Sequence, residues 1–170
     1  MDLDGKRVKK YFGWAFDTSR EAYLSILDDV PLFKGMGRKH LRKLLVDLIE
    51  KRYAQGDVIF HEGDSGKVLY VVLEGSVRIT KRLHSGERTL AILGPGSHFG
   101  ELALIDQGAR FATAAAEQES LLLIMYKSYF DDLIKNNSAI SQRILHNLAE
   151  ILSSYIHAEK TEEKAEETPK

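Results

Sequence analysis

The apolar positions divide the chain into a helical beginning, a strand-rich middle and a helical end. Before about Val30, aromatic and aliphatic residues alternate with charged ones, and Ser19 is placed to cap a helix that runs to about Leu27. Pro31 interrupts this pattern. A second helix is predicted over 38–50, with an apolar inner face made of Leu41, Leu44, Leu45, Leu48 and Ile49.

From Lys51 to Tyr126 the apolar residues fall in short runs rich in Val, Ile, Leu and Tyr. The runs read VIF, VLYVVLEG, VRITKRL and RTLAILG, and the HSGE segment has the composition of a hairpin tip. Short runs bounded by glycine and polar residues are typical of strands joined by tight turns. Because strands at this density need closure or a partner sheet to protect their edges, the middle predicts a barrel or roll.

Helical spacing returns after Tyr126. A short helix is predicted over 127–135, and Ser138 is placed to cap a longer helix that runs to about His157. One stripe of that helix has the 4-3-4 spacing of a coiled-coil seam: Ile144, Leu148, Ile151 and Tyr155. The stripe suits either a homodimer contact or a helix packed on its own roll. Residues 158–170 are almost without apolar side chains and are expected to be a disordered charged tail.

Composition narrows the classes of function. The 170 residues carry a formal net charge of −1, so no basic field is present to attract nucleic acid or an anionic membrane. The chain has no cysteine, which excludes a disulfide framework and a thiolate metal site. Charge interrupts the apolar runs well before the ~20 residues of a membrane span, and the first residues lack a signal peptide's apolar core. These features predict a cytoplasmic protein.

One segment, GPGSHFGELALIDQGARFAT over 94–113, has the residues of an anion site. Gly100 allows a turn and a close approach of the backbone. The residues from Glu101 to Ile105 can form a helical turn whose first N–H groups point outward and attract a phosphate. Arg110 can reach back over this turn with a guanidinium that matches two phosphate oxygens. Glu101 fits beside an anion if it accepts hydrogen bonds from a sugar hydroxyl.

This segment closely resembles the phosphate-binding cassette of cyclic-nucleotide-binding domains, as found in protein kinase A regulatory subunits and the catabolite activator protein. The resemblance runs from about Pro31 to Ile156 and includes PLFKG, YAQGD, IFHEGD and LYVVLEGSV. It implies a mainly β fold with flanking helices, in which an eight-stranded, jelly-roll-like β-roll is followed by two C-terminal helices. It also implies a binding domain over 31–157, preceded by a helical extension over 1–30.

The resemblance assigns a role to each candidate site residue. Glu101 would bind the ribose 2′-hydroxyl, and Arg110 would hold the cyclic phosphate, helped by the N–H groups of Leu102, Ala103 and Phe111. Tyr155 falls where the last helix of the family approaches the base and is predicted to stack on it as a lid, unless it belongs to the core or to a dimer seam. The predicted ligand-binding set is Phe99, Gly100, Glu101, Leu102, Ala103, Arg110, Phe111, Ala112 and Tyr155.

Two positions depart from the family pattern. Ala109 stands where a proline often precedes the arginine, and Phe111 stands where Ala, Ser or Thr is usual. Phe111 has no hydroxyl to recognise guanine, so cAMP is the expected ligand and cGMP the less favoured one. Its ring could also crowd the pocket, which leaves an altered ligand or a weak affinity open.

The leading interpretation is a sensor module that catalyses no reaction, carries no cofactor or metal, and signals to a protein effector through its C-terminal helices. The alternative is a degenerate roll that serves as an interaction or dimerisation module without nucleotide. Direct DNA binding is not expected, because only the polar tail follows His157. A cupin-type enzyme is disfavoured because the six histidines lack paired metal-ligand spacing.

Overall fold

The computed structural model describes residues 13–83, 86–105, 108–136 and 138–166, and this described part begins with helices. They are α2 (Gly13–Asp29), the 3₁₀ helix η1 (Pro31–Phe33) and α3 (Arg38–Asp47). Ser19 therefore lies inside α2 and does not cap it. The second predicted helix ends at Asp47 rather than Glu50, because the chain from Ile49 onward pairs with a strand. Ile49 is half exposed, so its place on the inner helix face was predicted wrongly.

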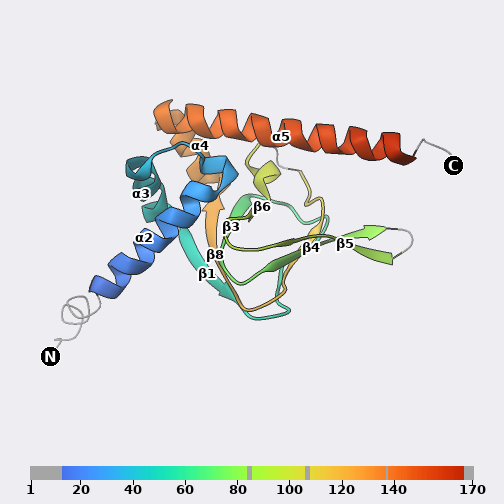
Figure 1. Cartoon of the computed structure of the whole chain (residues 1–170), viewed down its shortest axis with the longest axis horizontal. Coiled ribbons are helices and arrows are strands. Elements are labelled where there is room, and N and C mark those ends of the chain that lie inside the picture. Colours follow the sequence, from blue (N-terminus) through green and yellow to red (C-terminus); the bar gives the residue numbers. More distant parts are fainter. Residues whose placement is uncertain (1–12, 84–85, 106–107, 137, 167–170) are drawn as a thin grey trace.

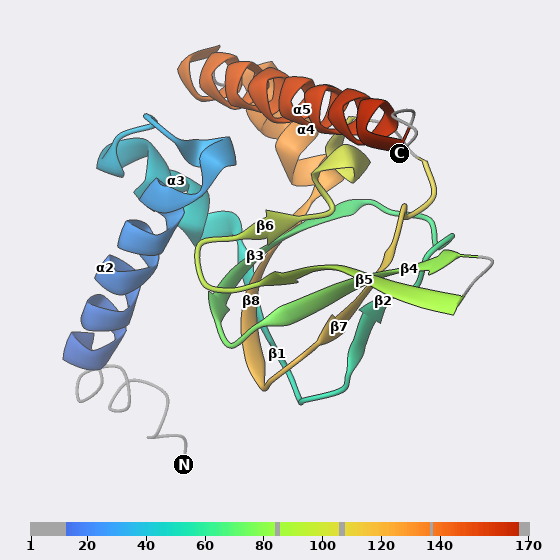
Figure 2. The same cartoon turned by 45° about the vertical axis from the view of Figure 1, so that its right-hand side comes forward.

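The described residues form eight strands in two antiparallel four-stranded sheets, which confirms the predicted β-roll (Figures 1 and 2). The first sheet has the order β1-β8-β3-β6 and the second has the order β2-β7-β4-β5. The bounds are β1 (Ile49–Tyr53), β2 (Val58–Phe60), β3 (Val68–Glu74), β4 (Val77–Leu83), β5 (Gly86–Leu93), β6 (His98–Phe99), β7 (Thr113–Ala116) and β8 (Ser120–Tyr126). The predicted hairpin tip lies partly outside the described residues, at 84–85, and its Gly86 and Glu87 belong to β5.

The core has two layers. One lies between the sheets and includes Tyr70, Val77, Phe99 and Leu122. The other lies between the first sheet and the helices, and it includes residues of α2, α3 and both C-terminal helices. Strand β8 is central in the first sheet and buried on both faces, which explains why its sequence is an unbroken apolar run.

Two helices follow the roll, α4 (Lys127–Asn136) and α5 (Ser138–Glu166). Both begin where the sequence places them, but α5 continues past His157 through most of the predicted disordered tail. Ala, Glu and Lys dominate that stretch and are strong helix formers, so low apolar content alone did not predict its structure. Residues 167–170 lie outside the described part. Figure 1 shows α5 lying across the top of the roll, with its C-terminal half above β4 and β5 in this view.

The first half of α5 packs on its own roll. Ile144 and Leu148 are 0% and 3% exposed and belong to the core between sheet and helices. Asn147, also buried, donates hydrogen bonds to the carbonyls of Leu32 at 2.9 Å and Lys34 at 3.0 Å. Two roles were predicted for the coiled-coil stripe, a homodimer contact and packing on the roll of the same chain. Ile144 and Leu148 take the second role.

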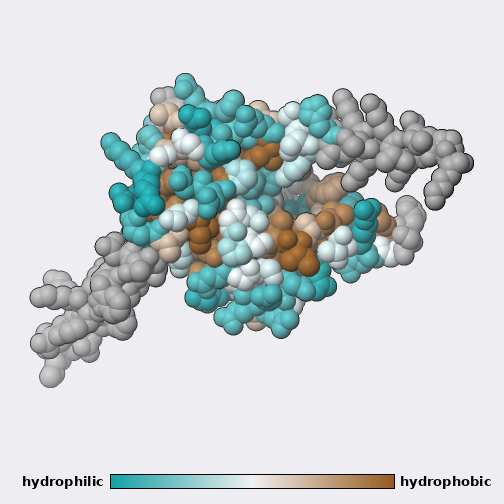
Figure 3. All heavy atoms as spheres, viewed as in Figure 1, coloured by the Kyte–Doolittle hydropathy of each residue, from teal (hydrophilic) through white to brown (hydrophobic). Residues whose placement is uncertain are grey.

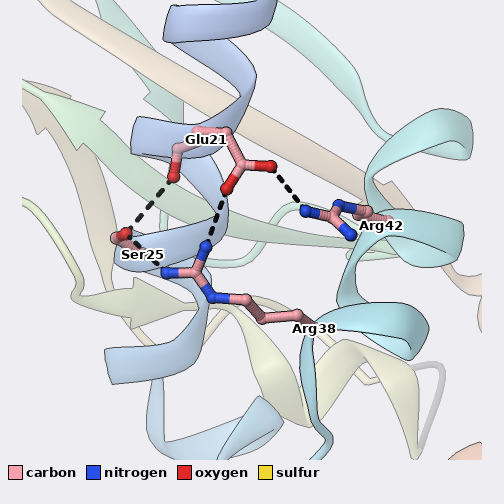
Figure 4. A network of polar contacts seen from close by, with 4 residues as sticks. All are labelled: Glu21, Ser25, Arg38 and Arg42. Carbon is pink, nitrogen blue, oxygen red and sulfur yellow. Dashed lines mark hydrogen bonds and ion pairs between the residues drawn. The ribbon is translucent and has the colours of Figure 1, made fainter.

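A polar network joins α2 to α3 on the surface (Figure 4). Glu21 accepts hydrogen bonds from Arg38 and Arg42, each at 2.7 Å, and Arg38 also donates to Ser25. These side chains are about half exposed, and exposed ion pairs contribute ~0–1 kcal/mol. The buried Leu24 and Leu27 therefore account for most of the attachment of α2.

The described surface contains both hydrophilic and hydrophobic residues. Figure 3 shows hydrophilic residues over the helices and along the lower edge, and hydrophobic residues reaching the surface between them. The exposed hydrophobic side chains include Leu90 and Ile92 of β5, an edge strand of the second sheet. No helix within the described residues is long and apolar enough to span a membrane.

Candidate functional site

The turn after β6 has the geometry expected of an anion cradle. Gly100 has φ +76°, in the left-handed region that glycine adopts without strain, and the 3₁₀ helix η2 (Glu101–Leu104) begins directly after it. The Ala103 N–H was predicted to help bind the phosphate. In the structure it donates to the Gly100 carbonyl at 3.2 Å and therefore closes the turn itself. Phe99, the residue before Gly100, is buried and stacks on Tyr70 in the roll interior.

Arg110 points into the roll and is 9% exposed. Its guanidinium donates to the Val68 carbonyl at 2.9 Å and to the Gly100 carbonyl at 3.4 Å, and it lies 4.1 Å from the centre of the Phe60 ring. A Cβ atom at Gly100 would lie 2.5 Å from the Arg110 Nη1 atom and 3.0 Å from the Val68 carbonyl oxygen, and together with the positive φ these contacts favour glycine there. The contact between the guanidinium and the Gly100 carbonyl is consistent with the prediction that Arg110 reaches back over the start of the turn.

The electrostatics of Arg110 are unusual for a buried cation. Burial lowers its pKa, although the nearby Tyr70, Glu101 and Asp64 oppose that shift. Within the described part of the chain no carboxylate forms an ion pair with it, and its hydrogen-bond partners are neutral groups, the Val68 and Gly100 carbonyls and the Tyr70 hydroxyl. Buried charges are normally paired, because an uncompensated one costs several kcal/mol. Arg110 is therefore suited to receive an anion.

Glu101 lies beside this cation and is 5% exposed. Its Oε1 atom accepts a hydrogen bond at 3.0 Å from the hydroxyl of Tyr155, a residue 54 positions further along the chain on α5. Burial and the neighbouring Glu101 carboxylate together raise the pKa of Tyr155. The structure thus brings Tyr155 to the site, through its hydroxyl group, while its side chain stays 45% exposed.

The Phe111 ring does not enter the site. It is 60% exposed, and the Lys81 ammonium lies 3.3 Å from its centre. The expected crowding of the pocket by this ring is therefore absent in this conformation. Ala112 is buried and Leu102 is 41% exposed. Ala109 pairs with Ser65 in an isolated bridge, so the loop keeps a backbone partner without a proline.

Sequence reasoning missed three residues at this site. Lys81 of β4 contacts Phe111, and Lys127 of α4 donates to the Leu104 carbonyl at 2.9 Å, which ties the end of η2 to the helices. His98 was interpreted as an ordinary strand-end residue. Burial lowers its pKa against the opposing effect of Glu101, and its Nε2 atom is buried with no hydrogen-bond partner among the described residues. Lys81 and Lys127 belong to no motif, and His98 has no assigned role in the 94–113 segment, so only contacts could identify the three residues.

A separate hollow of the described surface lies away from this site. It measures about 1350 Å³ on the outer face of the second sheet, and its lining includes Val58, Arg78, Thr80 and Thr113. It includes neither Glu101 nor Arg110. The described residues also contain no cluster of three side chains that could hold a metal ion. The site is therefore defined by its charges and backbone, not by cavity size.

Comparison with known proteins gives a consistent answer. The Cyclic nucleotide-binding domain family matches residues 50–137. The Cyclic AMP receptor protein of Thermus thermophilus is 40% identical over 125 residues, which cover 72% of this chain and 56% of that protein. The crystal structure of Thermus thermophilus Catabolite Activator Protein superposes with a TM-score of 0.73 at 36% identity, covering 79% of this chain and 62% of that one.

A second similar structure contains a ligand. It is the regulatory domain of Toxoplasma gondii PKA with cAMP, with a TM-score of 0.63 at 30% identity, covering 68% of this chain and 44% of that one. The chain spans about half the length of the Thermus receptor protein. Because the family match extends over half of the sequence and includes the turn and the arginine described above, the chain belongs to the cyclic nucleotide-binding domain family.

Proposed function

We propose that this chain is a sensor module that binds cAMP at Arg110 and Glu101 and transmits binding through α4 and α5. The observation that carries the proposal is the buried Arg110 guanidinium, which has no carboxylate partner within the described residues and lies beside the buried Glu101 carboxylate. A cyclic phosphate carries one negative charge and two free oxygens that match the guanidinium fork. The names of the similar proteins, which include cAMP receptors and a PKA domain with cAMP, support the same ligand.

Phosphate capture follows from the resting contacts of Arg110. The bond to the Gly100 carbonyl is long at 3.4 Å, so a phosphate oxygen can replace it at little cost. The N–H groups at the start of η2 add favourable partial charge around the same point. Exchange of a neutral acceptor for a charged one strengthens the hydrogen bonds of the guanidinium and offsets the cost of its burial.

Glu101 can hold the sugar while it remains bound to the lid. Tyr155 occupies its Oε1 atom, and a carboxylate has further acceptor sites on the other oxygen for the ribose 2′-hydroxyl. A ligand in this position would contact η2 and the helix that carries Tyr155 at once. The ligand therefore favours the arrangement in which α5 stays over the site, and this difference in affinity drives a population shift.

The base preference rests on Phe111 and the output on the helices. Phe111 offers no hydroxyl to guanine, which favours cAMP over cGMP. Lys127 and Tyr155 join η2 to α4 and α5, so a change in the turn is passed to both helices. The proposed partner is a protein effector that reads this change. A second copy of the chain is a further candidate, because Leu145 on α5 is 46% exposed.

The experiment is a calorimetric titration of the purified chain with cAMP, cGMP, 2′-deoxy-cAMP and a cyclic dinucleotide. The proposal expects one site, tightest binding for cAMP, and a weaker affinity for the 2′-deoxy ligand because Glu101 loses its sugar partner. If no member of the panel binds, the roll is an interaction module without nucleotide. If a cyclic dinucleotide binds best, the sensor role stands and the assigned ligand is wrong.

A further inference from the structure

A single ammonium group fixes the residue that follows the phosphate-binding arginine. The Lys81 Nζ atom donates to the Phe111 carbonyl at 2.8 Å and lies 3.3 Å from the centre of the Phe111 ring. The Glu62 carboxylate lies 3.7 Å from the same Nζ atom. The Lys81 side chain is 25% exposed, so these contacts are partly shielded from water. Both the backbone and the ring of Phe111 are therefore attached to β4.

Lys81 reaches Phe111 from the interior face of the roll. Val77 and Ile79 of β4 belong to the core between the sheets, and Lys81 follows them at the two-residue spacing that keeps side chains on one face. The irregular register nearby adds its extra residue to β5, so β4 keeps its alternation. Arg82, the next residue, points to the opposite face and lines the outer hollow.

Phe111 needs such an attachment. Its backbone lies outside the strands, since β7 begins only at Thr113, and no ladder fixes its torsions. A phenyl ring that is 60% exposed gains free energy by moving into an apolar environment. The aromatic group around the guanidinium of the preceding residue, Arg110, is such an environment and includes Phe60 and Tyr70. A ring placed there would cover the site.

We infer that Lys81 is a positioning residue that holds Phe111 outside the site and keeps Arg110 and Glu101 open to the ligand. The inference rests on the proposed function. Without Lys81, conformers with the Phe111 ring over Arg110 compete with the conformer in which the site is open. The apparent affinity is then the intrinsic affinity multiplied by the fraction of chains whose site remains open. The arrangement explains how the chain tolerates a large aromatic residue beside its phosphate-binding arginine.

The test is a double-mutant series titrated with cAMP by calorimetry. Lys81→Met keeps the length of the side chain and removes the charge and the donor, and we expect it to weaken binding about tenfold, as suits one hydrogen bond and one cation–π contact. Phe111→Ala keeps the backbone N–H assigned to the phosphate and removes only the ring, so it should bind within about twofold of the parent, and Lys81→Met/Phe111→Ala should return to that level. Arg82→Met is the matched control on the other face, and Lys81→Gln replaces Lys81→Met if the latter does not fold.

Rescue by the second substitution separates this role from a general loss of structure. Lys81→Met with unchanged affinity, or a double variant as weak as Lys81→Met, overturns the inference. Phe111→Ala that binds tenfold more weakly than the parent also overturns it, because the ring would then contact the ligand. A parent that binds no cyclic nucleotide removes the proposed function and this inference together. A parent that loses binding with Arg110→Ala but not with Lys81→Met removes the inference alone.

Discussion

The hydrogen bond between Tyr155 and Glu101 joins the helical lid to the site, and its contribution can be measured without ligand. Tyr155→Phe keeps the ring and removes only the hydroxyl. A hydrogen bond to a charged group contributes about 1.5–3 kcal/mol when it is buried. Glu101 is 5% exposed but Tyr155 is 45% exposed, and solvent weakens the interaction at the tyrosine end. We therefore expect a loss of about 1 kcal/mol in the free energy of unfolding.

For a chain of this length, 1 kcal/mol lowers the melting temperature by about 2–4 °C. Chemical denaturation of the parent, Tyr155→Phe, Glu101→Gln and the double variant gives the coupling free energy between the two side chains. The expected coupling is about 1 kcal/mol, because the second substitution finds the bond already weakened. Tyr126→Phe is the control, since Tyr126 is 47% exposed and its hydroxyl has no hydrogen-bond partner among the described residues.

A coupling below about 0.3 kcal/mol would refute this account, since independent sites add within that range. The conclusion would be that α5 is positioned by its apolar face alone. The proposed transmission from Glu101 to α5 would then lose its physical link. Loss of stability in Tyr155→Phe without coupling to Glu101 would lead to the same conclusion.

Three further predictions concern the surroundings of the site. Gly100→Ala should weaken cAMP binding at least tenfold, because its Cβ would lie 2.5 Å from the Arg110 Nη1 atom and displace the guanidinium. Gly56→Ala is the control, since Gly56 has a similar φ of +87° but no atom within 4 Å of its Cβ, and this variant should bind cAMP like the parent. Equal affinities of the two variants would contradict the prediction. Asn147→Leu should lower the free energy of unfolding by about 2–3 kcal/mol, since two carbonyls in the buried turn after α2 lose their donor, and a loss below about 0.5 kcal/mol in denaturant titration would argue against it. Burial lowers the pKa of His98, so below pH 6.5 the unfolded chain binds more protons than the folded chain. The free energy of unfolding should therefore decrease as the pH is lowered from 6.5, by at most about 1.4 kcal/mol per pH unit, until the folded histidine is also protonated. His98→Gln should reduce that slope while His146→Gln, on the exposed side of α5, should not; identical slopes for both would show that His98 is not responsible.

Most features that depend on a short stretch of the chain could be predicted from the sequence. The eight strands follow from short apolar runs and turns, and Gly100 with its short helix follows from local backbone preferences. The end of α3 was placed wrongly because pairing of Ile49 with β8 is a tertiary effect that competes with helical spacing. The tail was placed wrongly because apolar content measures core formation and not helix propensity.

The contacts of the site were only partly predictable. The resemblance gave Glu101, Arg110 and Tyr155, but the hydroxyl-to-carboxylate bond between α5 and η2 depends on where two distant segments meet. Lys81 and Lys127 lie outside any motif, and His98 lies in the 94–113 segment without an assigned role, so their contacts appear only in the structure. Phe111 shows the same limit, since the sequence marked it as unusual without showing that Lys81 holds its ring aside.

The most direct test of the account is a calorimetric titration of the parent chain and of Arg110→Ala with cAMP. We predict one binding site in the parent and an affinity at least about thirtyfold weaker in the variant, since loss of one partner of a buried charge pair costs about 2–5 kcal/mol. Arg78→Ala, in which the lost arginine pairs with Glu117 on the outer face of the second sheet, should bind like the parent. A parent that releases no heat with cAMP, or an Arg110→Ala protein that binds as tightly as the parent, would contradict the assignment of this arginine as the phosphate receptor.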